Sequence, residues 1–79
     1  DTAREWGALG IRSNVVVPGF MATAMSSTLT EEQRSKIYAR TSLKAATSIR
    51  SVAETVAFLL SDKAESITAQ NVHVDNGTI

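Results

Sequence analysis

The chain has 79 residues, of which 43% are hydrophobic and 20% charged, as is typical of one soluble globular domain at most. Eight basic and eight acidic side chains cancel, so no overall field draws the chain to nucleic acid or to an anionic membrane. The absence of cysteine excludes disulfides, thiolate catalysis and cysteine-ligated zinc. No apolar run approaches the roughly 20 residues that a membrane-spanning helix needs.

The amino-terminal part of the chain predicts a helix end followed by a strand. Asp1–Gly7 is compatible with the last turns of a helix, and its closing glycine together with Gly10 supplies stop signals. Ile11–Val17 begins with a β-branched residue and ends in three consecutive valines, which is typical of a strand covered on both faces in a parallel sheet. Pro18–Gly19 is expected to end this strand, because proline has no N–H for the ladder.

Two helices are predicted next. Thr30 and Gln33 form a capping box at the start of a helix over Glu31–Arg40. A polar and irregular stretch follows, after which Ser48 is placed to cap a helix over Ile49–Ser61. This second helix carries an apolar stripe at helical spacing, made of Val52, Ala53, Val56, Leu59 and Leu60.

The last expected element is a strand over Gln70–Asp75, which alternates valines with polar residues and stops at Asn76–Gly77. More than fifty residues and two helices separate it from the first strand, so the two strands are expected to be parallel. A two-stranded parallel sheet needs helices on both faces and further strands beside it. The sequence therefore predicts a fragment, one end of a doubly wound α/β sheet.

Four segments carry a resemblance to a known family. Residues 10–23 (GIRSNVVVPGFMAT) closely resemble the GIRVNxVxPGxxxT stretch of the short-chain dehydrogenase/reductases, and residues 3–7 (AREWG) look like the end of the helix before that strand. Residues 52–62 (VAETVAFLLSD) resemble the VAxxVxFLxSD helix, and residues 67–77 (ITAQNVHVDNG) resemble the final ITGQxxxVDGG strand. The resemblance covers the whole chain in family order, with the β-ketoacyl-acyl-carrier-protein reductase type as the nearest subgroup.

This resemblance implies that residues 1–79 are the carboxyl-terminal segment of a single Rossmann-fold reductase domain. It implies a cytoplasmic enzyme, homo-oligomeric and without nucleic-acid or membrane partners. The enzyme would move hydride between NAD or NADP and a ketone or alcohol, such as a β-ketoacyl thioester. The family's catalytic serine and Tyr-x-x-x-Lys lie upstream, so no catalytic residue is expected here. Tyr38, the only tyrosine, is followed four positions later by Ser42 instead of lysine, so it is not the catalytic tyrosine. The chain alone is therefore expected to be inactive.

The resemblance assigns cofactor contacts to Pro18, Gly19, Met21 and Thr23. Pro18–Gly19 follows the carboxyl end of a parallel strand, where open α/β sheets place their ligands. The Met21 backbone and the Thr23 hydroxyl would meet the nicotinamide carboxamide or the adjacent phosphate and orient the ring. The alternative is that Pro18–Gly19 is only a strand-ending turn and that Thr23 is a local cap.

An apolar lid over cofactor and substrate is a second expectation, against the alternative that the same residues only pack a surface helix. Between positions 31 and 50 there are five basic and two acidic residues, which would attract the phosphate of an acyl-carrier or coenzyme-A thioester. The alternative is a solvated helix face. The proposed lid residues are Met21, Met25, Leu29, Ile37 and Tyr38.

His73 has no second histidine or cysteine near it, so we expect a packed strand histidine and no metal site. Asn14 is expected to bridge backbone groups. Three departures from the family pattern are Ser13 for an apolar residue, residues 43–49 (LKAATSI) for LGRxGxPE, and Asn76 for a glycine.

A different class of function remains open at this point. The chain would then be a truncated, non-catalytic interaction module that pairs through an exposed sheet edge and its apolar helix stripe. In the family, the helix over residues 52–60 and the final strand commonly pack against another subunit. The same stripe would equally well pack against absent strands of its own sheet.

Overall fold

A computed structural model describes residues 1–22 and 28–78. The order of the elements is the predicted one: helix, strand, two helices, strand. The elements are α1 (Thr2–Trp6), the 3₁₀ turn η1 (Gly7–Leu9), β1 (Val15–Pro18), α2 (Glu31–Ala39), α3 (Ile49–Leu60), the 3₁₀ turn η3 (Asp62–Ala64) and β2 (Asn71–Val74).

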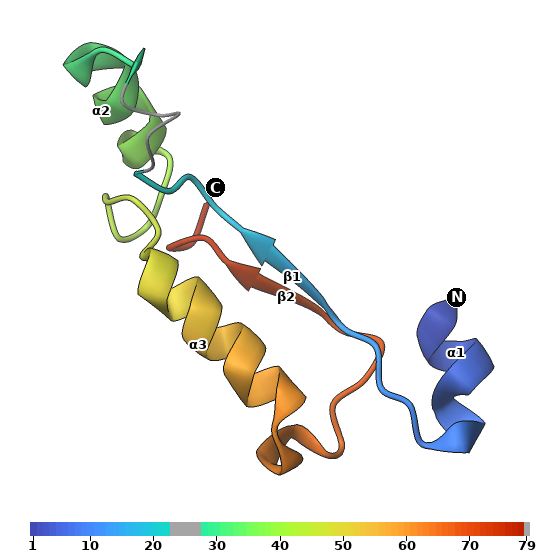
Figure 1. The fold of residues 1–79 in the computed structure, drawn as a ribbon. Helices are drawn as coiled ribbons and strands as arrows, with labels where there is room; N and C mark the ends of the chain where they lie inside the picture. The colour runs from blue at the N-terminus through green and yellow to red at the C-terminus, as the bar shows by residue number, and fades with distance from the viewer. Residues whose placement is uncertain (23–27, 79) are drawn as a thin grey trace.

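The two strands form a parallel pair, as the sequence predicts. Val15 is paired with Asn71 and Pro18 with Val74. The connection between the strands includes α2 and α3, and α3 lies along the sheet while α2 lies beyond the carboxyl ends of the strands (Figure 1). The described part of the chain is therefore a partial α/β layer of the Rossmann type.

Strand β1 begins at Val15, so the prediction that it starts at Ile11 is wrong by four residues. Ahead of β1 the chain is held by other bonds: the Ser13 N–H donates to the Thr68 hydroxyl at 3.1 Å, and the Ala69 N–H donates to the Ser13 carbonyl at 2.8 Å. Ala69 has a left-handed backbone, with φ of 61°. This turn keeps the partner segment from running alongside Ile11–Asn14, so regular pairing starts only after it.

Strand β1 ends at Pro18, as the sequence predicts, although Pro18 does not interrupt the pairing with β2. It is paired with Val74, and the Gly19 N–H still donates to the Val74 carbonyl at 3.0 Å. In a strand the N–H groups of successive residues point to opposite edges. The Val15 N–H, which donates to Gln70, and the Gly19 N–H both point to β2. The missing N–H of Pro18 therefore belongs to the other edge of β1.

The first helix is capped by Asp1, whose carboxylate accepts from the Arg4 N–H at 3.0 Å. Helix α1 ends at Trp6 with Gly7 as its C-cap residue, as the sequence predicts, but the Gly7 backbone is right-handed helical and the chain continues into η1. Gly10 does end the segment. Its φ is 81°, and its N–H donates to the Gly7 carbonyl.

Both predicted caps of the later helices are confirmed. The Thr30 hydroxyl accepts from the Gln33 N–H at 3.1 Å, and the Gln33 side chain accepts from the Thr30 N–H at 2.9 Å. The Ser48 hydroxyl accepts from the Ser51 N–H at 3.2 Å. Because these interactions join residues three apart, the local sequence was enough to place both helix starts.

Helix α3 packs against β1 through only part of its predicted stripe. Leu59 is buried and Val52 is half-buried, whereas Val56 and Leu60 of the same stripe are 39% and 79% exposed. One residue along a helix is a rotation of about 100°, which carries Leu60 off the face that Leu59 occupies. Phe58 is also exposed. Apolar side chains on both flanks of the buried face of α3 thus lie outside the contact with the sheet.

The described residues form an elongated body with extents of 49 × 21 × 20 Å. Their buried hydrophobic side chains are those of Ala3, Leu59 and Ala64 alone, and none of the larger side chains in this part is fully buried. The strands therefore do not shelter themselves, as the sequence predicts for a fragment of a larger sheet. Across residues 1–22 and 28–78, no helix combines the length and the apolar content that crossing a bilayer requires.

Two polar side chains fix the segment before β1. The Arg12 guanidinium donates to the carbonyls of Leu59, Ile67 and Ser61 at 2.8, 3.3 and 3.4 Å. The Asn14 amide donates to the Ile67 carbonyl at 3.0 Å and accepts from the Gln70 N–H at 3.1 Å, which confirms its backbone-bridging role. The role of Arg12 was missed, because its acceptors are 47 to 55 positions away in the chain.

Candidate functional site

The carboxyl ends of β1 and β2 form one side of a cleft of about 440 Å³. Pro18 and Gly19 leave β1 at this point, and Asp75 leaves β2 beside them. Helix α2 contributes Ile37 to the same cleft. Parallel α/β sheets bind ligands just beyond the carboxyl ends of their strands, so this cleft is the candidate site.

The predicted contact residues are only partly brought together. Pro18 and Gly19 line the cleft, as does Phe20. Met21 follows directly and is half-buried, and its backbone N–H makes no hydrogen bond with another described residue. Thr23 lies outside the described residues. The visible part of the site is therefore a backbone wall with an N–H donor next to it.

Gly19 is closely surrounded by the segment after β2 and by the loop before α3. A side-chain carbon at position 19 would lie 2.7 Å from the Thr47 hydroxyl oxygen and 2.8 Å from the Cα of Asp75. Both distances are well inside normal contact, so only glycine fits there. The immediate neighbours of this glycine are therefore parts of the same chain.

The loop before α3, residues 41–47, runs alongside the carboxyl-terminal segment. Its Thr47 N–H donates to the Phe20 carbonyl at 2.7 Å, and Thr47 is buried. At the other end of the loop, Thr41 pairs with Thr78 in an isolated antiparallel bridge. The loop therefore connects the end of the chain to the wall that follows β1.

Of the described residues proposed for the lid, only Ile37 lines the cleft. The Phe20 and Tyr38 rings meet edge to face with centroids 5.9 Å apart, which ties α2 to the wall. Ile37 lines the cleft, whereas Met21 and Leu29 are half-buried outside its lining. Met25 lies outside the described residues. Because Tyr38 packs on Phe20, the geometry gives it a packing role.

Comparison with known proteins decides the family. Residues 1–78 match the family model described as enoyl-(acyl carrier protein) reductase. The chain is 43% identical over 75 residues to a 3-oxoacyl-[acyl-carrier-protein] reductase of Haemophilus influenzae, and 41% identical over 75 residues to that of Escherichia coli. It is 40% identical over 77 residues to that of Staphylococcus aureus. The chain belongs to the short-chain dehydrogenase/reductase family.

The match covers most of this chain but a smaller part of each relative. The aligned residues are 95% of the chain for the Haemophilus influenzae protein and 98% for the Staphylococcus aureus protein, and in each case 31% of the relative. The chain thus spans less than a third of the length of these short-chain reductases. The relatives named are all reductases, and the interaction-module alternative gains no support from them.

The basic residues of this short-chain reductase segment are mostly engaged locally. Lys36 lies 3.9 Å from Glu32, Arg50 lies 2.9 Å from Glu54, and the Lys44 ammonium donates to the Ala39 carbonyl at 2.6 Å, near the end of α2. These contacts fit the solvated-face alternative. Arg40 is the exception that touches the site, since it lines the cleft and makes no ion pair with a described residue.

His73 is exposed, so the expectation of a packed histidine is wrong. Its side chain is 61% accessible and its Nδ1 lies 3.9 Å from an Asp75 carboxylate oxygen. On β2 the valines alternate inward, which leaves His73 on the outward face. In the described ranges, no three histidine, cysteine or acidic residues come together as a metal site would require.

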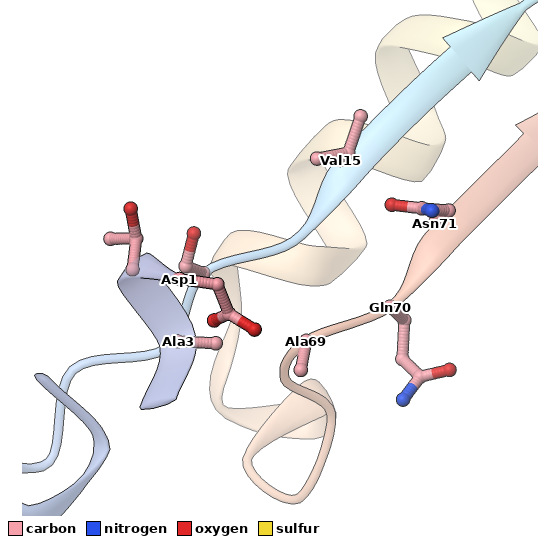
Figure 2. Close-up of a pocket in the computed structure, with 8 residues that line it drawn as sticks. Asp1, Ala3, Val15, Ala69, Gln70 and Asn71 are labelled. Carbon is pink, nitrogen blue, oxygen red and sulfur yellow. The ribbon is translucent and has the colours of Figure 1, made fainter. Parts of the chain in front are cut away.

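A second cavity, of about 430 Å³, lies at the other end of the strands (Figure 2). Asp1 and Ala3 of the first helix segment stand on one side of it, and Ala69, Gln70 and Asn71 stand on the other. This is the amino-terminal end of the parallel pair, away from the end at which such sheets bind ligands. We therefore assign the site to the cleft beside Pro18 and Gly19.

Proposed function

We propose that residues 1–79 are the carboxyl-terminal segment of a cytoplasmic NAD- or NADP-dependent reductase. The enzyme transfers hydride between the nicotinamide and a ketone or alcohol, with a 3-oxoacyl thioester as the substrate class. The observation that carries this proposal is the placement of the Pro18–Gly19 wall at the carboxyl ends of two parallel strands, in a chain of this family. The similarity to 3-oxoacyl-[acyl-carrier-protein] reductases supports the thioester substrate.

The cleft fits the nicotinamide end of such a cofactor in size and in donors. Its volume of about 440 Å³ lies in the range of small-molecule sites. The Met21 N–H beside it is without an acceptor among the described residues and would donate to a carboxamide or phosphate oxygen. Pro18, Gly19, Met21 and Thr23 would hold the cofactor here, and the bound nicotinamide supplies the hydride chemistry.

The role of this segment is positional. The Pro18–Gly19 backbone would limit one face of the ring, while the Met21 N–H and the Thr23 hydroxyl would fix its rotation. Ile37 of α2 would exclude water from the same cleft. No residue of the segment is assigned proton transfer to the substrate oxygen, so we expect the 79 residues alone to show no turnover.

The Thr23 hydroxyl gives the most direct test. In the full-length reductase, Thr23→Ala is expected to raise the KM for the nicotinamide cofactor about fivefold to tenfold, the effect of losing one hydrogen bond of 1 to 1.4 kcal/mol. Thr23→Ser keeps the hydroxyl and should restore the KM. Thr2→Ala, an exposed change at the far end of the strands, is the control. Unchanged turnover and cofactor affinity in Thr23→Ala would refute the assigned role.

Arg40 is proposed to meet the phosphate of the acyl-carrier or coenzyme-A portion of the substrate. It lines the cleft and its charge has no partner among the described residues. Arg40→Gln should raise the KM for the thioester and weaken its dependence on salt, without changing the KM for the cofactor. Arg50→Gln, which removes a cation already paired with Glu54, is the matched control. Equal effects of the two variants would contradict the assignment.

We also propose that the full-length reductase is a homo-oligomer that uses exposed apolar side chains of α3. Phe58 and Leu60 are 44% and 79% exposed and lie on the two flanks of the buried Leu59, about 200° apart around the helix. Sedimentation of the full-length reductase with Phe58→Asp should show a smaller particle than the unchanged protein. The same particle mass for both proteins would contradict this interface.

A further inference from the structure

Asn76 makes two side-chain hydrogen bonds that were not predicted from the sequence. Its Nδ2 donates to the carbonyl of Ala45 and to the carbonyl of Ala46, each at 3.0 Å. Its backbone is left-handed, with φ of 56°. An amide nitrogen has two hydrogens, so both donors of Asn76 are used on neighbouring carbonyls of one loop.

The backbone next to Asn76 holds the other half of the same loop. The Ser42 N–H donates to the Gly77 carbonyl at 2.9 Å, and the Leu43 N–H donates to the Asn76 carbonyl at 3.1 Å. Between the two sets of bonds stands Lys44, with a left-handed φ of 55°. A residue other than glycine costs about 1 kcal/mol or more in this conformation, so the loop needs bonds on both sides of Lys44 to keep its path.

The far end of this loop contacts the wall of the cleft. The Thr47 N–H donates to the Phe20 carbonyl at 2.7 Å, and the Thr47 hydroxyl lies beside Gly19. Thr47 is 4% exposed. Ala45 and Ala46, whose carbonyls Asn76 binds, directly precede Thr47, so a change in their position moves the group that holds Phe20.

We propose that Asn76 is a positioning residue for the cleft: its side-chain amide fixes residues 45–47, and through Thr47 it fixes the backbone of Gly19 and Phe20. Two of the three departures from the family pattern, the 43–49 stretch and Asn76, thereby meet in space. The proposal rests on the proposed function, in which this backbone forms the nicotinamide-side wall.

The test uses two variants of the full-length reductase. Asn76→Asp keeps the size of the side chain and its tolerance of left-handed backbone, but it places a carboxylate against two carbonyl oxygens. Asn76→Gly keeps the backbone conformation and removes the side chain, so it serves if the first variant does not fold. Asn71→Asp is the matched control, since Asn71 is exposed on β2 and its side chain makes no hydrogen bond with a described residue.

Hydrogen exchange without cofactor is the first measurement. Both Asn76 variants are expected to speed exchange in the peptide over residues 41–47 about tenfold, the equivalent of about 1.4 kcal/mol of lost protection. The Gly19 amide, which donates to the Val74 carbonyl, should follow, while Asn71→Asp should change neither. Unchanged exchange in the 41–47 peptide of both Asn76 variants overturns the proposal.

Kinetics is the second measurement, and it separates positioning from a general loss of structure. The KM for the nicotinamide cofactor is expected to rise about fivefold, as for a lost interaction of about 1 kcal/mol, with the KM for the thioester changed by less than about twofold. Faster exchange with both KM values unchanged, or with both raised equally, overturns the positioning role. If the full-length reductase without substitutions neither binds nor oxidises NAD(P)H, the proposed function is overturned. The positioning role then falls with it, whatever the exchange rates are.

Discussion

The backbone of Gly19 lies against Asp75, so that a side-chain carbon at position 19 would stand 2.8 Å from the Cα of Asp75. The two residues are the first beyond the paired ends of their strands, and the Gly19 N–H donates to the Val74 carbonyl. The strands thus stay together one step past Pro18. This contact fixes the place where the cleft begins.

We expect Gly19→Ala to lower the free energy of unfolding of the full-length reductase by about 2 kcal/mol, because the new methyl group meets backbone at Asp75 and cannot be accommodated without a shift. Denaturant titration measures this. Gly7→Ala is the matched control: nothing lies within 4 Å of the added carbon and the backbone is right-handed helical, so stability should be unchanged or slightly higher. Equal stability of the two variants would mean that the close contact is absent in solution.

Arg12→Met should lower the free energy of unfolding by about 2 kcal/mol, because a charged donor that holds three carbonyls is lost. Arg12→Lys should recover only part of this loss, since an ammonium does not reproduce the fork of the guanidinium. Thermal and denaturant unfolding measure both variants. Arg4→Met, at an exposed position whose side chain makes no bond in the described residues, should be neutral. A neutral Arg12→Met would disprove the anchoring role.

Ala69→Gly is expected to stabilise the full-length reductase by about 1 kcal/mol. Ala69 has a φ of 61°, in a region that disfavours any side chain with a Cβ, and glycine removes that cost. Ala45→Gly, at a residue without positive φ, should instead lower stability slightly by adding freedom to the unfolded chain. A change of the same sign in both variants, measured by denaturant titration, would argue against strain at Ala69.

Thr30→Ala should loosen the first turn of α2, with hydrogen exchange at residues 32–34 faster by about fivefold, the effect of losing a cap of about 1 kcal/mol. Helix α2 has no buried residue, so little packing compensates for the lost cap. Ser35→Ala, in the exposed middle of the helix, should leave exchange equal or slower, because alanine favours helix. Exchange in Thr30→Ala as slow as in the unchanged protein would show that α2 does not depend on its cap.

The sequence predicted well what depends on residues close together in the chain. The caps at Thr30 and Ser48 join residues three apart, and the parallel direction of the strands followed from the helices between them. The predictions from the sequence failed where residues far apart in the chain determine the structure. The late start of β1 depends on Thr68 and Ala69, and the exposure of His73 depends on which face of β2 is covered.

In the candidate site too, the features that depend on neighbouring residues were predicted, and those that depend on distant residues were not. Pro18 and Gly19 were located from their position after a run of valines, and the structure places them in the cleft. The bonds of Thr47 to Phe20 and of Asn76 to Ala45 span 27 and 31 positions and leave no periodic trace in the sequence. The departure from the family motif at Asn76 was the one signal available, and by itself it does not indicate a side-chain bond.

The proline at the end of β1 has a consequence for any strand that pairs with its other edge. Val16 offers an N–H along that edge, whereas the next residue on the same side, Pro18, has none. A strand on that edge would therefore lack a hydrogen bond at Pro18, at the level where β2 is still bonded to β1. Its pairing with β1 would end sooner than that of β2. The sheet would then open on one flank of the cleft only. The cause of this asymmetry is the pyrrolidine ring of Pro18, which replaces the N–H group.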